Sequence, residues 1–131
     1  MSSFFDTLLQ LDDILAQTAI SSSHLKLCQL ELEKNSLPQI PQDYIDFLSV
    51  ANGLYYNGAL LYGVSPDLKV IKDILSANKK PSSNLILGEN DSDWLIFDSK
   101  ESEFQIRDKT DASLWKHSAS LFDVLPYLLQ I

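Results

Sequence analysis

The chain has 131 residues and a formal net charge of −8, from ten Lys and Arg against eighteen Asp and Glu. This length predicts one domain over residues 1–131, large enough to bury a hydrophobic core without disulfides. The acid excess excludes non-specific nucleic-acid binding, which needs cations to neutralise phosphates. The single cysteine, Cys28, excludes an internal disulfide and a zinc-ligand pattern.

The first residues predict neither a secretory signal nor a membrane span. No basic segment precedes the apolar residues, and Asp6, Asp12 and Asp13 interrupt them. Together with the lone cysteine, this favours a cytoplasmic protein. Ser3 and Asp6 resemble a capping box, which predicts a first helix that continues to about Ala16.

The segment from Ser23 to Lys34 predicts a second helix. Two short stretches in it alternate apolar and polar residues as a strand does, so a strand is the alternative. The helix is favoured because the segment is rich in Leu, Lys, Gln and Glu and contains no β-branched residue.

Residues 37–53, LPQIPQDYIDFLSVANG, predict a third helix with a defined start and stop. Pro41 suits the first helical position, and Asp43 places a carboxylate in the first turn, where the helix dipole favours negative charge. Asn52 and Gly53 predict the stop, because glycine readily adopts the left-handed conformation that ends a helix. Apolar residues at i, i+3, i+4 and i+7 form one stripe: Tyr44, Phe47, Leu48 and Ala51.

Beyond the third helix the sequence predicts a series of short strands. Residues 54–58 predict an aromatic turn that leads into a strand over 59–62, and residues 65–67 predict another turn. Residues 69–78 fit either a helix or an irregular crossover. Four further strands are expected at 85–87, 94–97, 104–107 and 114–115, with the polar residues 98–102 as a hairpin connection.

A closing helix is predicted from about Ser120. Pro126 lies inside it and lacks the backbone N–H of a regular helix, which costs about 3 kcal/mol in a helix interior. We therefore expect a kink or a shortened helix at this point. Helices, then strands, then a last helix predict an α+β fold: N-terminal helices followed by a mainly antiparallel sheet and a C-terminal helix.

These segments resemble the SUKH superfamily of Smi/Knr-type domains, and especially its YrhA-like bacterial branch. The similarity covers about residues 22–130. It rests on the LPxIPxDYxxFLxxxNG pattern at 37–53 and on four shorter segments: ALLYG at 59–63, ILG at 86–88, DSDWLIFD at 91–98 and SLFDVL at 120–125. Pro126 departs from the family pattern. The resemblance implies a SUKH-like fold and a structural role for the motif residues Pro41, Tyr44, Phe47, Leu48, Asn52 and Gly53.

Residues with catalytic or metal-binding chemistry are few. The alternating acids of residues 89–93 are similar to a calcium loop, but Trp94 and Lys100 occupy the places where an EF-hand needs glycine and a bidentate carboxylate. A looser metal site is the alternative to a simple polar turn.

The two histidines, His24 and His117, would form a base and nucleophile with Cys28 only by converging in space. Cys28 lies among leucines, which favours a buried, inert thiol. The four glycines form no phosphate-binding loop. We therefore predict no enzyme, no catalytic residue, no metal and no cofactor.

The acids are concentrated between residues 89 and 103, where six acids accompany one base. We predict that this segment and two tyrosines form a surface that binds a protein, since complementary charge speeds association and exposed tyrosines favour interfaces. The alternative is ordinary solvated surface, with tyrosines that cover the end of the sheet. The predicted binding residues are Tyr55, Tyr56, Glu89, Asp91, Asp93, Asp98, Glu101 and Glu103.

The family resemblance implies a non-enzymatic binding protein. Bacterial relatives of this kind are immunity proteins that neutralise polymorphic or contact-dependent toxins by direct binding. An acidic surface suits the basic cleft of a nuclease toxin, which it would occlude. The expected partner is thus a basic protein domain, and neither nucleic acid nor a membrane. An intracellular scaffold or regulatory domain of the Smi/Knr type is the alternative.

Overall fold

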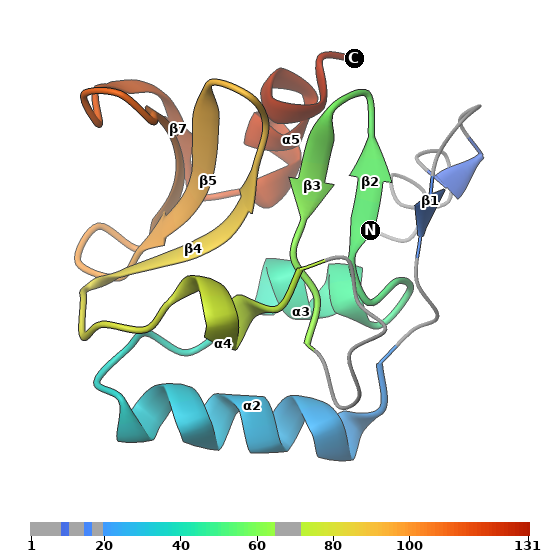
Figure 1. Cartoon of the computed structure of the whole chain (residues 1–131), viewed down its shortest axis with the longest axis vertical. Helices are drawn as coiled ribbons and strands as arrows, with labels where there is room; N and C mark the ends of the chain where they lie inside the picture. The colour runs from blue at the N-terminus through green and yellow to red at the C-terminus, as the bar shows by residue number, and fades with distance from the viewer. Residues whose placement is uncertain (1–8, 11–14, 17–19, 65–71) are drawn as a thin grey trace.

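The computed structural model describes residues 9–10, 15–16, 20–64 and 72–131. Within them the strands form one sheet in sequence order from β1 to β7, each antiparallel to the next. This architecture of helices around an antiparallel sheet confirms the predicted α+β class (Figure 1). The elements are β1 (Leu15–Ala16), α2 (Ser22–Lys34), α3 (Gln42–Leu48), β2 (Leu54–Tyr56), β3 (Ala59–Leu61), α4 (Ile74–Ala77), β4 (Asn84–Glu89), β5 (Asp93–Asp98), β6 (Glu103–Asp108), β7 (Leu114–Ser118) and α5 (Leu121–Leu129).

The helices enclose the core from different sides. α2 and α3 lie below the strands in the view of Figure 1, whereas α5 lies behind the upper part of the sheet. α5 packs on β5, β6 and β7, while α4 bridges α2 and β4. Side chains from helices and strands thus share one core, whose largest fully buried members include Leu32, Tyr44, Phe47, Leu61, Tyr62, Leu85, Leu87 and Phe104.

α2 and α3 confirm the second and third predicted helices, and all four residues of the α3 stripe are buried. Two details of α3 were predicted wrongly. Pro41 is the residue before the first helical one, because its backbone is extended and its carbonyl accepts the first helical bonds. The helix also ends at Leu48, so Gly53, with φ 101°, lies beyond its end and does not cap it.

The prediction of a helix that continues to about Ala16 was wrong at its end, because Leu15 and Ala16 form β1 and pair with β2. Such pairing supplies partners for backbone groups at the sheet edge, a relation that local periodicity cannot reveal. Ser3 and Asp6, which predicted the start of this helix, lie outside the described residues.

The predicted aromatic turn is a hairpin. Residues 54–56 form β2, and only Asn57 and Gly58 form the turn to β3, both with positive φ. An Asn-Gly pair is the preferred two-residue turn because both positions accept that conformation readily. The predicted turn at 65–67 lies outside the described residues. α4 confirms the helical alternative for the last part of residues 69–78.

The four predicted later strands are confirmed as β4 to β7, with residues 98–102 at the β5–β6 hairpin. α5 continues through Pro126 to Leu129, so of the two alternatives expected at Pro126 the shortened helix is wrong and the kink stays a prediction. Groups outside the helix hold both of its ends. Asp43 and Ser120 accept hydrogen bonds from its first backbone N–H groups, and Asn57 and Asn90 donate to its last carbonyls.

Candidate functional site

The residues of the helix motif connect α3 to the sheet. The Tyr44 hydroxyl donates to the backbone carbonyls of Tyr62 and Leu87, and the Asn52 side chain exchanges two hydrogen bonds with the backbone of Val64. A Cβ atom at Gly63 would lie 2.5 Å from the Asn52 carbonyl oxygen, which explains why glycine occurs there. The motif therefore has a structural role, and the binding surface must be sought elsewhere.

The predicted acidic segment does not form one continuous surface. Asp91 lies in the β4–β5 turn and Glu101 in the β5–β6 turn, and both are exposed. These turns lie at opposite ends of β5, about 20 Å apart for a six-residue strand. A single small contact cannot include both acids.

Glu89 bridges three side chains of the fold. Its carboxylate accepts hydrogen bonds from Tyr62, from Lys72 at 2.9 Å and from Lys109 at 3.3 Å. Burial raises the pKa of this carboxyl, but these hydrogen bonds and the Lys72 charge outweigh burial and lower the pKa to about 2. Burial and the bond to Glu89 raise the pKa of Tyr62 far above its usual value. Most of the Glu89 charge is therefore neutralised within the molecule.

Three other acids of the segment have partners within the sheet. Asp93 is only 9% exposed and accepts a hydrogen bond from the Trp115 indole N–H at 3.1 Å. Asp98 accepts backbone N–H groups of the β5–β6 turn. Glu103 interacts with Gln105 and His117, whose hydrogen bonds lower the pKa of the Glu103 carboxyl. Their contact with a partner stays a prediction.

The two predicted tyrosines differ in exposure. Tyr55 is 38% exposed, whereas Tyr56 is half-buried and packs against the core. Both lie on β2, whereas Glu103 of the acidic segment lies on β6. Three strands stand between β2 and β6 in the sheet order. Only Tyr55 presents a large part of its ring to solvent.

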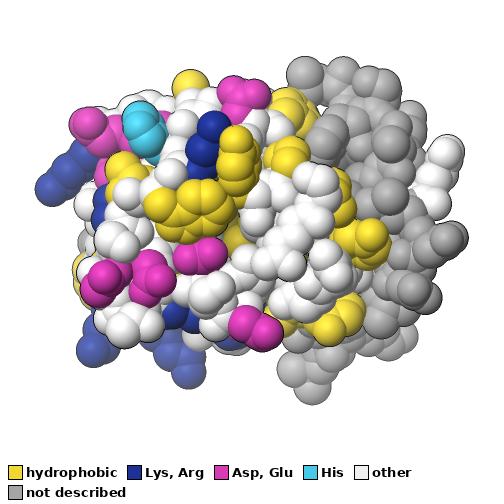
Figure 2. All heavy atoms as spheres, turned by 90° about the horizontal axis from the view of Figure 1, so that it is seen from above, with side chains coloured by type: hydrophobic (Ala, Val, Ile, Leu, Met, Phe, Trp, Pro, Cys, Tyr) yellow, Lys and Arg dark blue, Asp and Glu magenta, His cyan; other side chains and the backbone are white. Residues whose placement is uncertain are grey.

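A more exposed aromatic cluster lies where β7 meets α5, and we call it the Trp115–Tyr127 patch, formed by Trp115, Tyr127 and Ile131. Its three side chains are 46–54% exposed. The two rings pack edge to face with centroids 5.6 Å apart, and the Lys116 ammonium lies 4.5 Å from the centre of the Tyr127 ring. Figure 2, which looks onto the upper end of the molecule, shows hydrophobic side chains gathered beside acidic ones.

The exposed charges around this patch are acidic. Asp91, Asp111 and Asp123 are exposed. The nearby cations are half-buried and already engaged: Lys109 with Glu89, Lys116 with the Tyr127 ring, and Arg107 with Gln105 and the Ala112 carbonyl. The patch therefore combines apolar anchors with a negative rim, a composition suited to a partner with apolar and basic groups.

The sequence interpretation missed this patch. It identified the strand at 114–115 but gave no role to Trp115 or Tyr127. The available signal was position: the last strand of a meander lies at a sheet edge, where fewer elements cover its side chains. β7 is that edge, and its residues are exposed or half-buried along its whole length.

The sulfur and imidazole groups are not assembled for catalysis. Cys28 is buried in α2, and burial, with the charges of Asp73 and Glu31, raises the pKa of its thiol to about 12. His24 hydrogen-bonds Ser21 at the start of α2, and His117 hydrogen-bonds Glu103 on β6. The thiol is thus protonated at neutral pH, and each described imidazole has a partner other than Cys28.

Two further properties concern the described part of the chain. It contains no group of three or more His, Cys, Asp or Glu side chains that could hold a metal ion. Its helices are all too short or too polar to cross a membrane.

No protein-family model matches this sequence, and no curated protein matches it either. The resemblance to SUKH domains therefore rests on the quoted motifs alone.

Proposed function

We propose that this protein is a non-enzymatic intracellular binding protein of the SUKH type, and that it serves as an immunity protein that neutralises a bacterial toxin. The observation that supports a binding role best is the exposed Trp115–Tyr127 patch with its acidic rim. Exposed tryptophan and tyrosine supply much of the binding free energy at protein interfaces. The protein would cover the basic functional cleft of a polymorphic or contact-dependent toxin and block access of its substrate.

The acidic rim supports a basic partner over a neutral one. Asp91, Asp111 and Asp123 raise the encounter rate with a positively charged cleft. The apolar rings then exclude water from the contact. The predicted residue Asp91, in the β4–β5 turn, remains a candidate for this contact, whereas Tyr55 lies on β2, far from β7 in the sheet order. Glu101, at the opposite end of β5, falls outside the proposed contact.

The second candidate function is a scaffold or regulatory domain of the Smi/Knr type. The same patch would then bind several intracellular proteins. The neighbouring gene separates the two functions, because an immunity protein is encoded beside a large protein with a variable C-terminal toxin domain.

Co-expression with the toxin domain of the neighbouring gene tests the proposal. The immunity function predicts restored growth and co-purification of the two proteins. Toxicity that persists with every neighbouring candidate toxin would overturn this function and favour the scaffold.

Variants locate the contact. The double variant Trp115→Ala/Tyr127→Ala should lower the affinity about thirtyfold or more, the loss expected for one interface hot spot. The control is Leu27→Ala/Leu30→Ala, which removes two exposed hydrophobic side chains (61% and 47% exposed) from α2. Thermal unfolding checks that both variants are folded. Equal affinity of the two folded variants would contradict the assignment of the patch.

A further inference from the structure

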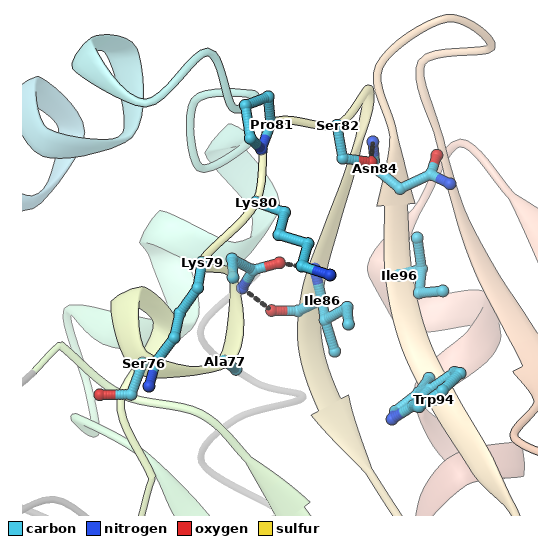
Figure 3. A pocket seen from close by; sticks show the side chains of 11 residues that line it. Ser76, Ala77, Lys79, Lys80, Pro81, Ser82, Asn84, Ile86, Trp94 and Ile96 are labelled. Atoms are coloured by element: carbon cyan, nitrogen blue, oxygen red, sulfur yellow. Dashed lines mark hydrogen bonds between the residues drawn. The ribbon is translucent and has the colours of Figure 1, made fainter.

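A hollow of about 550 Å³ lies on the opposite side of β5 from α5 and is separate from the Trp115–Tyr127 patch. The loop after α4 forms one wall, and the outer face of β4 and β5 forms the floor (Figure 3). The floor is apolar, with Ile86, Trp94 and Ile96. The volume of the hollow falls within the range of about 300–1,000 Å³ that is typical of small-molecule sites.

The wall of this hollow is held in place. Asn78 is 8% exposed, and its side chain donates to the carbonyls of Ile74 and Ile86 and accepts the Ile86 backbone N–H at 2.8 Å. Figure 3 shows this exchange between the loop and β4 as dashed lines. A site that exists before the ligand arrives costs less ordering entropy on binding.

The polar groups of the hollow are in part without protein partners. Within the described part of the chain, Lys79 and Lys80 form no ion pair. The Asn84 side-chain oxygen is buried and has no hydrogen-bond partner there. Buried acceptors without a donor are rare in native proteins, and each requires an explanation.

The positions of these groups indicate the kind of ligand that would fit the hollow. Trp94 lies at one end of the floor and Asn84 at the other, and Lys80 extends from the wall toward the floor between them (Figure 3). Asn84 pairs with Asp98, four residues after Trp94 on β5, so the floor is about 13 Å long. Two acids lie beside this floor, Asp98 opposite Asn84 and Glu89 opposite Trp94. Both carboxylates accept hydrogen bonds within the fold, whereas Lys79 and Lys80 remain without an ion pair among the described residues.

We propose that this hollow binds a small organic anion with a flat apolar ring and a phosphate or carboxylate group. The ring would lie against Trp94 and Ile96, and the anion near Lys79 and Lys80. This inference does not depend on the proposed toxin partner.

Nuclear magnetic resonance titration of the full chain tests the site. The anionic probes are adenosine monophosphate and 1-naphthylacetate, and the neutral counterparts are adenosine and 1-naphthylacetamide. A Trp115→Phe background leaves Trp94 as the only tryptophan, so its indole N–H signal reports on the hollow alone. Each anion should shift this signal and the backbone amide signals of residues 78–84. Its affinity from the titration should be at least tenfold higher than that of its neutral counterpart. Inorganic phosphate alone should leave the indole signal unchanged.

Lysine variants supply the second readout. Lys79→Gln/Lys80→Gln should weaken binding of both anions at least tenfold, whereas Lys26→Gln/Lys34→Gln, which removes the same charge from α2, should not. Three results would each overturn the proposal: no shift of the Trp94 signal by either anion at millimolar concentration, equal binding of the neutral counterparts, or equal loss in the two lysine variants. Each result is independent of toxin neutralisation.

Discussion

At the scale of single residues, several polar groups that look available in the sequence are used inside the fold. Glu89 accepts hydrogen bonds from a tyrosine and two lysines, and Asp93 accepts the Trp115 indole N–H. Tyr44, fully buried, donates to two backbone carbonyls. Burial strengthens such bonds and makes an unpaired group costly, so these side chains specify the fold.

The Glu89 carboxylate makes the free energy of unfolding depend on pH. Its pKa is about 2 in the folded protein and 4.5 in the unfolded reference, so its charge stabilises the fold above pH 4.5. That contribution is lost as the pH falls from 4.5 to about 2. Glu89→Gln should therefore lower the free energy of unfolding by about 1–3 kcal/mol at neutral pH.

Urea unfolding at a series of pH values measures this difference. The gap between the parent and Glu89→Gln should narrow as the pH falls through that window. Glu101→Gln, at an exposed position, serves as the control and should match the parent throughout. A gap that stays constant down to the acid limit would contradict the role assigned to the Glu89 charge.

At the scale of elements, α5 depends on other segments for both of its ends. Asp43 of α3 accepts the backbone N–H of Leu121, and Asn90 of the β4–β5 turn donates to the carbonyl of Leu128. Pro126 cannot supply a backbone hydrogen bond, yet the helix continues to Leu129. Tertiary contacts at the ends, together with burial of its apolar face, stabilise the helix despite the proline.

Asn90→Asp tests the capping of α5. The variant keeps the oxygen that accepts the N–H groups of Ser92 and Asp93, but it loses the donor to Leu128 and places a negative charge at a helix C-terminus. We expect a loss of about 1–2 kcal/mol at neutral pH. Chemical denaturation measures this loss.

The matched control is Asn35→Asp at the end of α2, where an exposed side chain makes the same kind of bond to Glu31. Because this bond is exposed to solvent, Asn35→Asp should lower the free energy of unfolding by only a few tenths of a kcal/mol. If both variants lose the same stability, burial is not what makes the Asn90 bond important.

At the scale of the whole molecule, exposed acidic residues and exposed hydrophobic side chains lie at the same end. The Trp115–Tyr127 patch lies at the sheet edge beside α5, and the exposed charges near it are acidic. Association with a basic partner should therefore be fast at low salt and slow as salt screens the field.

If the proposed basic partner is correct, the triple variant Asp91→Lys, Asp111→Lys, Asp123→Lys should slow association with it about 10- to 100-fold at low salt. Each change adds two charges, so the net charge moves from −8 to −2. The control variant Glu31→Lys, Glu33→Lys, Glu101→Lys has the same net charge with the changes elsewhere. Stopped-flow mixing over a salt series measures both rates, and equal slowing would show that net charge, not its location, matters.

Much of the fold could be predicted because local chemistry decides it. The α3 stripe, the leucine-rich α2 and the strands at β4 to β6 carry their periodicity or propensity in contiguous residues. The α+β class follows from the order of these elements. The acidic segment was equally plain in sequence, yet the turns of β5 divide it between two ends of the molecule.

The sequence by itself determined α2 and α3, the later strands, the acidic character and the structural nature of the residue 37–53 motif, because each depends on neighbours along the chain. Only the tertiary structure decided that Leu15 and Ala16 form a strand, that Glu89 and Asp93 have internal partners, and that Trp115 and Tyr127 meet at an exposed edge. These features depend on which distant segments come together. Pairing and burial are properties of such contacts, and no single segment contains them.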